Sequence, residues 1–322
     1  MGYIFLMGKI LSKIGFASLF SFFVFIVSLP LFIFIDPSAP IIYLDSTITF
    51  PLGGMLFFIS LIFIRSGKKL LKKEGLYEAS EKSLRVLFDW APLPILLFIY
   101  ENFKARIHLF NHKDFTPYLI EFDRTLFGTD LSIYLQKVVS PILTDVMAFF
   151  YAIYFAIPFI CLWIFYIKSM EREFRLSSAM LVLCFYIGFI GYVLVPMKPP
   201  WAYLDGAFTK KLHGIFLHNT FDSFYKRHNP SAEWGAFPSL HVGVSTLGLL
   251  ISYRFKGMIG RGRALFYILL PFVIGLWVST IYLRHHWFID IVAGWIVAII
   301  AYEMGNYLEK GWEKVLKKVG LR

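Results

Sequence analysis

The feature that most constrains the fold of this chain is a series of long apolar segments separated by short polar ones. A helix needs about 20 apolar residues to cross the roughly 30 Å hydrocarbon core of a bilayer. Because lipid offers the backbone no hydrogen-bond partner, continuous apolar segments of this length are predicted to be helices. The candidate segments span residues 14–35, 46–64, 86–103, 141–167, 176–195, 238–253, 264–283 and 288–308. The sequence therefore predicts an all-α polytopic membrane protein with about eight transmembrane helices.

The composition agrees with a membrane protein and argues against a nucleic-acid partner. Hydrophobic residues make up 58% of the 322 residues and charged residues only 16%, whereas soluble domains carry about 25% charged residues. The net charge of +11 comes from Lys and Arg in the short segments between apolar runs. Because these cations are dispersed and form no single basic face, they are better explained by membrane topology than by nucleic-acid binding.

The same cations predict how the chain is oriented. The apolar run at 14–35 is too long for a signal peptide and lacks a small-residue cleavage site, so we expect a retained helix. If the N-terminus is cytoplasmic, most of the 32 Lys and Arg residues fall on the inside, as the positive-inside rule requires. Both termini are then cytoplasmic. The segments that follow Val195 and surround Pro238 and His286 meet on the extracytoplasmic or lumenal side.

Four regions follow from these patterns. Residues 1–103 hold the N-terminal transmembrane helices and a basic cytoplasmic loop, and residues 104–140 mix charges with aromatic and aliphatic side chains. That mixture is typical of an amphipathic segment at the membrane interface, although an ordinary connecting loop is the alternative. Residues 141–308 form the predicted catalytic helical core, and residues 309–322 a basic cytoplasmic tail.

The densest polar cluster lies beside the last apolar run. His286 and Asp290 are four residues apart, a spacing that places both on one face of a helix. The carboxylate can then accept the imidazole N–H and leave the other ring nitrogen free to attack as a nucleophile. The alternative is an interfacial histidine beside an aspartate that merely stabilises the positive end of the helix dipole.

Two further clusters are predicted at the same side of the membrane. Pro238 suits the first turn of a helix, Ser239 is a plausible cap, and His241 then projects from the helix start, where backbone N–H groups favour anions. Lys198, between prolines and before Trp201, is available to meet a phosphate. A purely structural cap and a lysine that extends to the interface are the corresponding alternatives.

Taken together in this order, the clusters resemble the type 2 phosphatidic acid phosphatase superfamily, whose motifs run K-x6-R-P, P-S-G-H and S-R-x5-H-x3-D. The second motif is matched at 238–241 with Leu240 in place of Gly, and the third at 279–290 with Thr280 in place of Arg. Lys198 stands where the first motif has Arg, and Gly191 where it has Lys. The resemblance implies a six-helix phosphatase-like core in the C-terminal two-thirds of the chain.

The departures resemble one branch in particular, the inositol phosphorylceramide synthase-like phosphotransferases. The strings at 235–241 and 282–290 match that branch, and 123–128 is similar to a segment upstream of its core. The resemblance implies His286 as nucleophile, Asp290 as its orienter and His241 as general acid and base. It places Lys198, with Ser239, Arg284, Trp201 and His285, at the substrate. No metal and no cofactor are expected.

Altered charges at the family's phosphate-binding positions indicate the kind of substrate. Gly191 and Thr280 each lose a cation, and Lys198 lacks the bidentate fork of an arginine. Less cationic compensation suits a phosphodiester with one negative charge, which favours transfer of a phospho-alcohol headgroup such as phosphoinositol between membrane lipids, or to a sugar. The alternatives are a lipid or polyprenyl phosphate phosphatase that uses water as acceptor, and a noncatalytic scaffold on the same fold.

Overall fold

The computed structural model describes residues 14–42, 73–104, 106–220, 233–258 and 263–320, with a few isolated residues between 53 and 61. In these ranges all the regular secondary structure is helical, and the nearest approach to a sheet is an isolated bridge between Met197 and Gly235. Six helical stretches in the described ranges are long and apolar enough to cross a membrane. They are Phe16–Ile35, Ala79–Lys104, Pro141–Ile167, Glu171–Leu194, Ala264–Tyr282 and Phe288–Lys318. The prediction of an all-α polytopic membrane protein is confirmed.

Two of the predicted segments have a different outcome. The run at 46–64 lies largely outside the described residues. The run at 238–253 forms α14, Leu240–Arg254, which has 15 residues. At 1.5 Å per residue this helix is about 22 Å long, short of the hydrocarbon thickness. Its first turn carries His241, so the short helix begins at one of the predicted site residues.

The chain divides into two compact units. The first contains α2 (Phe16–Ile35), α4 (Lys73–Trp90), most of α5 (Pro92–Lys104) and the part of α16 (Phe288–Lys318) that follows Gly305. Within it, the end of α16 is joined to the start of α2. The N–H of Phe16 donates to Glu309 Oε2 at 3.0 Å, and the indole N–H of Trp312 donates to the carbonyl of Ile14 at 2.9 Å.

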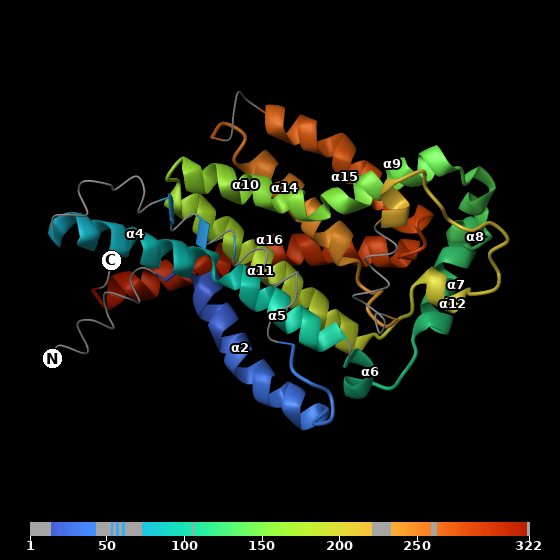
Figure 1. The fold of residues 1–322 in the computed structure, drawn as a ribbon, viewed down its shortest axis with the longest axis horizontal. Coiled ribbons are helices and arrows are strands. Elements are labelled where there is room, and N and C mark those ends of the chain that lie inside the picture. Colours follow the sequence, from blue (N-terminus) through green and yellow to red (C-terminus); the bar gives the residue numbers. More distant parts are fainter. Residues whose placement is uncertain are drawn as a thin grey trace. The chain divides into compact units, whose positions relative to one another are not determined.

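The second unit, residues 104–305, is built around α14. This helix packs against α10 (Ala156–Ile167), α11 (Glu171–Leu194) and α15 (Ala264–Tyr282), and α15 also packs against α9 (Pro141–Ala152). Figure 1 shows these helices running alongside one another. Val242, Leu247 and Ile251 of α14 are buried, which explains why the helix is apolar on all sides.

Glycines allow α14 and α16 to approach each other closely. A Cβ atom added at Gly294 of α16 would lie 2.6 Å from the backbone oxygen of Ser239 and 3.1 Å from the backbone N of Gly243. A Cβ at Gly243 would lie 3.2 Å from the carbonyl oxygen of Gly294. The two backbones are therefore in direct contact, and any side chain at Gly294 would force them apart.

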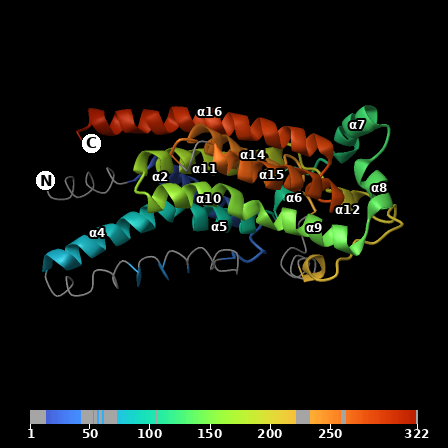
Figure 2. The same cartoon turned by 90° about the horizontal axis from the view of Figure 1, so that it is seen from above.

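Short helices gather at the end of the second unit where α16 begins. They are α6 (Ile107–Phe110), α7 (Thr116–Phe127), α8 (Leu131–Leu135), the 3-10 turn η2 (Gln136–Val138) and α12 (Pro200–Tyr203). Both Figure 1 and Figure 2 place α7, α8 and α12 at this end. α7 is amphipathic, because Ile120 and Asp123 are buried while Tyr118 is 76% exposed and Leu126 56% exposed.

The contact between α14 and α16 leads to a prediction about stability. We expect Gly294→Ala to destabilise the protein by about 1–3 kcal/mol, since the added methyl group meets backbone atoms that cannot rotate away. The matched control is Gly311→Ala on the same helix, where an added Cβ meets nothing within 4 Å. Thermal unfolding in detergent measures the difference. Equal melting temperatures for the two variants would show that the close contact is not limiting.

Candidate active site

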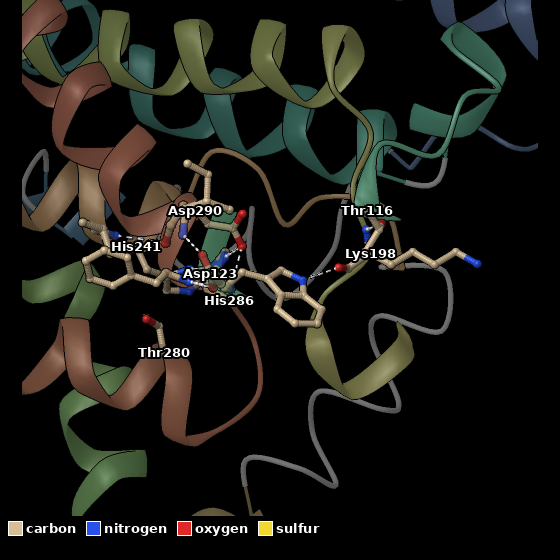
Figure 3. A network of polar contacts seen from close by, with 12 residues as sticks. Thr116, Asp123, Lys198, His241, Thr280, His286 and Asp290 are labelled. Atoms are coloured by element: carbon tan, nitrogen blue, oxygen red, sulfur yellow. Dashed lines mark hydrogen bonds and ion pairs between the residues drawn. The ribbon is translucent and has the colours of Figure 1, made fainter. Parts of the chain in front are cut away.

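Three side chains form a hydrogen-bonded chain at the start of α14 and α16. Nδ1 of His286 lies 3.3 Å from Oδ2 of Asp290, and Nε2 of His286 lies 3.4 Å from Nδ1 of His241. Figure 3 shows the two imidazole rings facing each other with the carboxylate behind His286. His286 is 4% exposed and Asp290 is fully buried. The structure therefore brings together the three residues to which the sequence assigns catalysis.

The local geometry differs from the predicted one. α16 begins at Phe288, so His286 lies in the turn before the helix, and the prediction that His286 and Asp290 share one helical face is wrong. The pair meets because Asp290 also accepts the backbone N–H of Trp287 at 2.9 Å, which folds the turn back onto the carboxylate. The backbone N–H groups of His285 and His286 both donate to the carbonyl of Thr280, at 2.9 and 3.1 Å.

His241 is held by the start of α14. Ser239 is the N-cap of this helix, and its hydroxyl accepts the N–H of Val242 at 3.4 Å, which confirms the predicted cap. Pro238 precedes the helix instead of lying in its first turn, because α14 begins at Leu240. The backbone N–H of Ser239 donates to the carbonyl of Asp290 at 3.0 Å. This bond joins the segment that carries His241 to the segment that carries the other two residues.

The hydrogen-bond chain implies one arrangement of protons. If Nδ1–H of His286 donates to Asp290, Nε2 carries the lone pair and accepts from Nδ1–H of His241. Burial lowers the pKa of His286 from 6.5 to about 4, against the opposite effect of a backbone hydrogen bond with Ala236. The imidazole of His286 is therefore neutral near pH 7. A neutral imidazole with an oriented lone pair is a competent nucleophile.

The histidine pair is closed in this structure. A phosphorus atom attacked by one nitrogen, with its leaving oxygen hydrogen-bonded to the other, requires the nitrogens to be roughly 6 Å or more apart. The observed 3.4 Å between His286 Nε2 and His241 Nδ1 is too short to hold a phosphoryl group. A phosphate can enter only if it replaces this hydrogen bond and separates the two rings.

Two tyrosines that the sequence did not indicate surround His241. The ring of Tyr151 is stacked on His241 with centroids 4.4 Å apart and an interplanar angle of 27°. The ring of Tyr154 lies at the same centroid distance with a larger tilt of 43°. Both belong to the apolar run at 141–167, where aromatic residues are ordinary membrane-helix residues. No pattern in the sequence distinguishes them from the other aromatics of that run.

A buried carboxylate from α7 caps α16. Oδ2 of Asp123 accepts the N–H of Phe288 at 2.6 Å, and Oδ1 accepts the N–H of Ile289 at 2.9 Å. Asp123 is 1% exposed, and its burial raises the pKa from 3.8 to about 6, although the two backbone hydrogen bonds act to lower it. In the sequence, Asp123 is only part of the 123–128 segment that resembles the synthase-like branch. Its role as a cap depends on contacts with residues more than 160 positions away.

The neighbours of Asp123 hold this segment in place. Arg124 forms a bidentate ion pair with Asp130, with Nε–Oδ1 at 2.9 Å and Nη2–Oδ2 at 3.1 Å. That contact raises the pKa of Arg124. Gly128 ends α7 with a left-handed φ of 68°, a conformation that a glycine adopts without steric cost. The segment is thus a helix end that presents Asp123 to α16.

The side chain of Lys198, which was predicted to bind the substrate phosphate, does not lie beside the two histidines. The Nζ of Lys198 lies 4.6 Å from the centre of the Trp234 ring, and Figure 3 shows its side chain pointing away from the two histidines. Its backbone is used instead, because its N–H donates to Thr116 Oγ1 and its carbonyl accepts the indole N–H of Trp287, both at 2.8 Å. The structure therefore does not bring the Lys198 ammonium group to the histidine pair.

Arg284 is engaged by the loop that follows α12. Its guanidinium donates to the carbonyl of Lys210 at 2.6 Å and lies 3.7 Å from the centre of the Phe208 ring. Burial lowers the pKa of Arg284, and its backbone has a left-handed φ of 65°. The N–H of Trp201 donates to the carbonyl of Arg284 at 3.0 Å. Arg284 and Trp201 thus connect the loop to the turn that carries His286.

Two of the family's charged positions are filled by close packing. A Cβ at Gly191 would collide with the ring of Pro238, so no lysine fits there without displacing the segment that carries His241. Thr280 is fully buried, and its hydroxyl donates to the carbonyl of Trp277 at 2.7 Å. Neither position retains space or polarity for a cation in this structure.

A family model and several known proteins match this chain. A family model described as "PAP2 superfamily" matches residues 117–304. An inositol phosphorylceramide synthase catalytic subunit of Saccharomyces cerevisiae is 37% identical over 98 residues, which is 30% of this chain and 21% of that protein. A phosphoinositol dihydroceramide synthase of Bacteroides thetaiotaomicron is 27% identical over 180 residues, 51% of this chain and 56% of that protein.

A further relative extends the match. The inositol phosphorylceramide synthase catalytic subunit of Schizosaccharomyces pombe is 28% identical over 210 residues, 58% of this chain and 46% of that protein. The matches therefore span between about a fifth and just over half of the relatives' own length. No solved structure matches the chain significantly.

The cap provided by Asp123 can be tested by substitution. We expect Asp123→Asn to lower the stability by about 1–2 kcal/mol, because an amide has one acceptor oxygen where two backbone N–H groups need acceptors. The matched control is Glu121→Gln on the same helix, whose side chain is 63% exposed. Thermal unfolding of the two purified variants measures the effect. If Asp123→Asn unfolds at the same temperature as Glu121→Gln, the cap does not stabilise α16.

Proposed function

The chain belongs to the PAP2 superfamily, and from that membership we propose that it is a membrane phosphotransferase with a phosphohistidine intermediate. It moves a phospho-alcohol headgroup such as phosphoinositol from a phospholipid donor to a lipid or sugar alcohol. The observation that carries the proposal is the chain from Asp290 through His286 to His241, with distances of 3.3 and 3.4 Å. The names of the relatives, phosphoinositol and inositol phosphorylceramide synthases, support the choice of headgroup.

The first chemical step is the transfer of the headgroup to His286. Nε2 attacks the phosphorus in line with the ester oxygen of the donor lipid, and that P–O bond breaks. His241, which enters this step as an imidazolium, gives one proton to the departing oxygen and becomes neutral, so that the lipid leaves as a neutral alcohol. Asp290 stabilises the positive charge that develops on His286 and keeps its ring oriented.

The second step returns the phosphoryl group to an acceptor. His241 takes the proton of the acceptor hydroxyl, whose oxygen attacks the phosphorus and breaks the P–N bond to His286. His241 is then protonated again and His286 is neutral, so the cycle closes without a net change in protons. The same residue acts as acid in one half and as base in the other.

The positions of the cations support a phosphodiester over a phosphomonoester. Lys198 lies against Trp234, Arg284 is bound to the Lys210 carbonyl, and Gly191 is packed against Pro238. A monoester carries nearly two negative charges near neutral pH and would need more compensation than a diester. A headgroup transferase handles only diesters, which agrees with the described part of the site, where Lys198 and Arg284 are engaged by Trp234 and by the Lys210 carbonyl.

The setting of the site supports lipid substrates. The six apolar helical stretches make this a multi-pass membrane protein, and the aromatic face of α7, with Tyr118, Phe122 and Leu126 exposed, suits the membrane interface. We place the site on the extracytoplasmic or lumenal side, with both termini cytoplasmic, because this orientation follows from the distribution of Lys and Arg.

Product analysis tests the proposed reaction. Purified protein given phosphatidylinositol and a ceramide or diacylglycerol is expected to yield a new inositol-phosphate lipid, and little inorganic phosphate from a phosphatidic acid monoester.

We expect His286→Gln to abolish turnover, because amide nitrogen is not nucleophilic, and Asp290→Asn to reduce it at least 100-fold. The covalent intermediate is measured with radiolabelled donor quenched in base, where phosphohistidine survives. If inorganic phosphate is released and no headgroup is transferred, the protein is a phosphatase and the transferase proposal is wrong.

The pH dependence of the first step tests the state of His286. With a pKa of about 4, the nucleophile is neutral at pH 5.5, and we expect phosphoenzyme formation to keep more than half of its pH 7.5 rate. An imidazole with the ordinary pKa of 6.5 would lose about tenfold over the same range. Because Asp123 titrates near pH 6, Asp123→Asn is measured in parallel and normalised to its own rate at pH 7.5. A tenfold loss in both proteins would contradict the prediction.

A further inference from the structure

The ring of Tyr151 stacks on two imidazole rings. Its ring is stacked on His241 at 4.4 Å and 27°, and on His285 at 4.7 Å and 23°. His241 belongs to α14, His285 to the turn before α16, and Tyr151 to the last turn of α9. Three segments that are distant in the sequence thus contribute one stack of near-parallel rings. Neither Tyr151 nor His285 takes part in the two steps of the proposed reaction.

We propose that Tyr151 is the positioning residue of the general acid His241, and that His285 supports Tyr151 by stacking on it. The inference rests on the proposed function, in which His241 protonates the leaving alcohol. It concerns how His241 remains in place when the substrate is bound, which the hydrogen bonds of the closed site do not explain.

The need for such a residue follows from the closed histidine pair. The described contacts of His241 are its hydrogen bond to His286 and the faces of Tyr151 and Tyr154. When the phosphoryl group separates the two imidazoles, the hydrogen bond is lost and only the ring contacts remain. A stacked ring limits movement to the plane of the stack. His241 can therefore move away from His286 and still keep its ring plane directed at the leaving oxygen.

The stack also favours the protonated form of His241. The face of a tyrosine ring carries negative potential and attracts a cation placed over it, which is worth a few-fold to about 30-fold when the pair is desolvated. The groups that face His241 are Tyr151, Tyr154, His285 and His286, with Asp290 behind His286. Because His241 must become an imidazolium during each cycle, the aromatic face stabilises the state that the reaction needs.

The backbone places Tyr151 and Tyr154 together. α9 ends at Ala152 and continues as the 3-10 turn η3, Ile153–Phe155, before α10 begins at Ala156. A 3-10 turn has three residues per turn, so residues three apart lie above each other. Tyr151 and Tyr154 are three residues apart across this junction, and both rings contact His241. His285 is fixed independently, since its backbone N–H donates to the carbonyl of Thr280 at 2.9 Å.

The test compares two donors that differ in their need for an acid. Phosphatidylinositol releases an alkyl alcohol that must be protonated, whereas a nitrophenyl phosphodiester of inositol releases nitrophenolate, which leaves without a proton. We expect Tyr151→Leu to slow headgroup transfer from phosphatidylinositol to His286 about tenfold, and the same first step with the nitrophenyl diester less than threefold. The first step is followed in a single turnover, as phosphoenzyme formed, because the second step needs His241 as base whichever donor is used. Tyr151→Phe keeps the aromatic face and should restore the wild-type ratio of the two first-step rates.

Controls separate this role from a general effect on folding. Tyr166→Leu removes a tyrosine that packs against Phe174 near the end of α10 that is distant from η3. It should leave the ratio of the two rates unchanged. Tyr151→Met is a second nonaromatic variant in case the leucine variant does not fold, as judged by thermal unfolding. An equal loss on both donors, or no loss on either, would overturn the inference.

Failure of the proposed function would be visible separately. If the wild-type protein hydrolyses the two diesters but transfers no headgroup to an alcohol, the transferase proposal fails. The ratio of the two rates of phosphoenzyme formation in Tyr151→Leu still decides whether Tyr151 positions His241.

Discussion

The close contact of α14 with α16 is the constraint on which the rest of the site depends. Gly243 and Gly294 remove the side chains that would separate the two backbones, and the N–H of Ser239 then reaches the carbonyl of Asp290 at 3.0 Å. With the helices in register at this point, His241 and His286 approach within 3.4 Å although they are 45 residues apart in the sequence. Backbone contact determines the distance between the histidines more directly than the histidines' own hydrogen bond does, because that bond must open whenever a phosphate enters between them.

Buried carboxylates at this end of the second unit act through backbone N–H groups. Asp123 accepts two of them at the start of α16, and Asp290 accepts one from Trp287 while it orients His286. Helix starts carry partial positive charge and unsatisfied N–H donors, so a carboxylate placed there is stabilised without a cationic partner. This use of helix starts explains how Asp123 and Asp290 are buried without an ion pair to a lysine or arginine among their described contacts. It also leaves the turn that carries His286 held from both sides, by its own helix and by α7.

The residues that differ from the family motifs are explained by packing. Leu240 replaces the glycine of the second motif, and its side chain occupies the space beside Gly188 on α11, where a Cβ would collide with it. Gly191, in the position of the first motif's lysine, is covered by Pro238. A small residue on α11 thus accompanies each bulky one in the 238–240 segment. At position 191 the lysine of the family motif is replaced by a glycine that packs against Pro238. The loss of this positive charge agrees with the proposed substrate, which carries a single negative charge.

The sequence by itself determined the helical class, the membrane setting and the identity of the three residues at the site. These properties are encoded locally, in runs of apolar residues, in the Ser239 cap and in short motifs with distinctive spacing. Tertiary structure alone decided that His286 precedes its helix, that Lys198 turns toward Trp234, that Asp123 caps α16, and that Tyr151 stacks on His241. The contact between Asp123 and Phe288 joins residues 165 positions apart. Sequence periodicity does not predict such a contact, because the distance between two segments depends on how the helices pack. It also depends on where a glycine allows two backbones to touch.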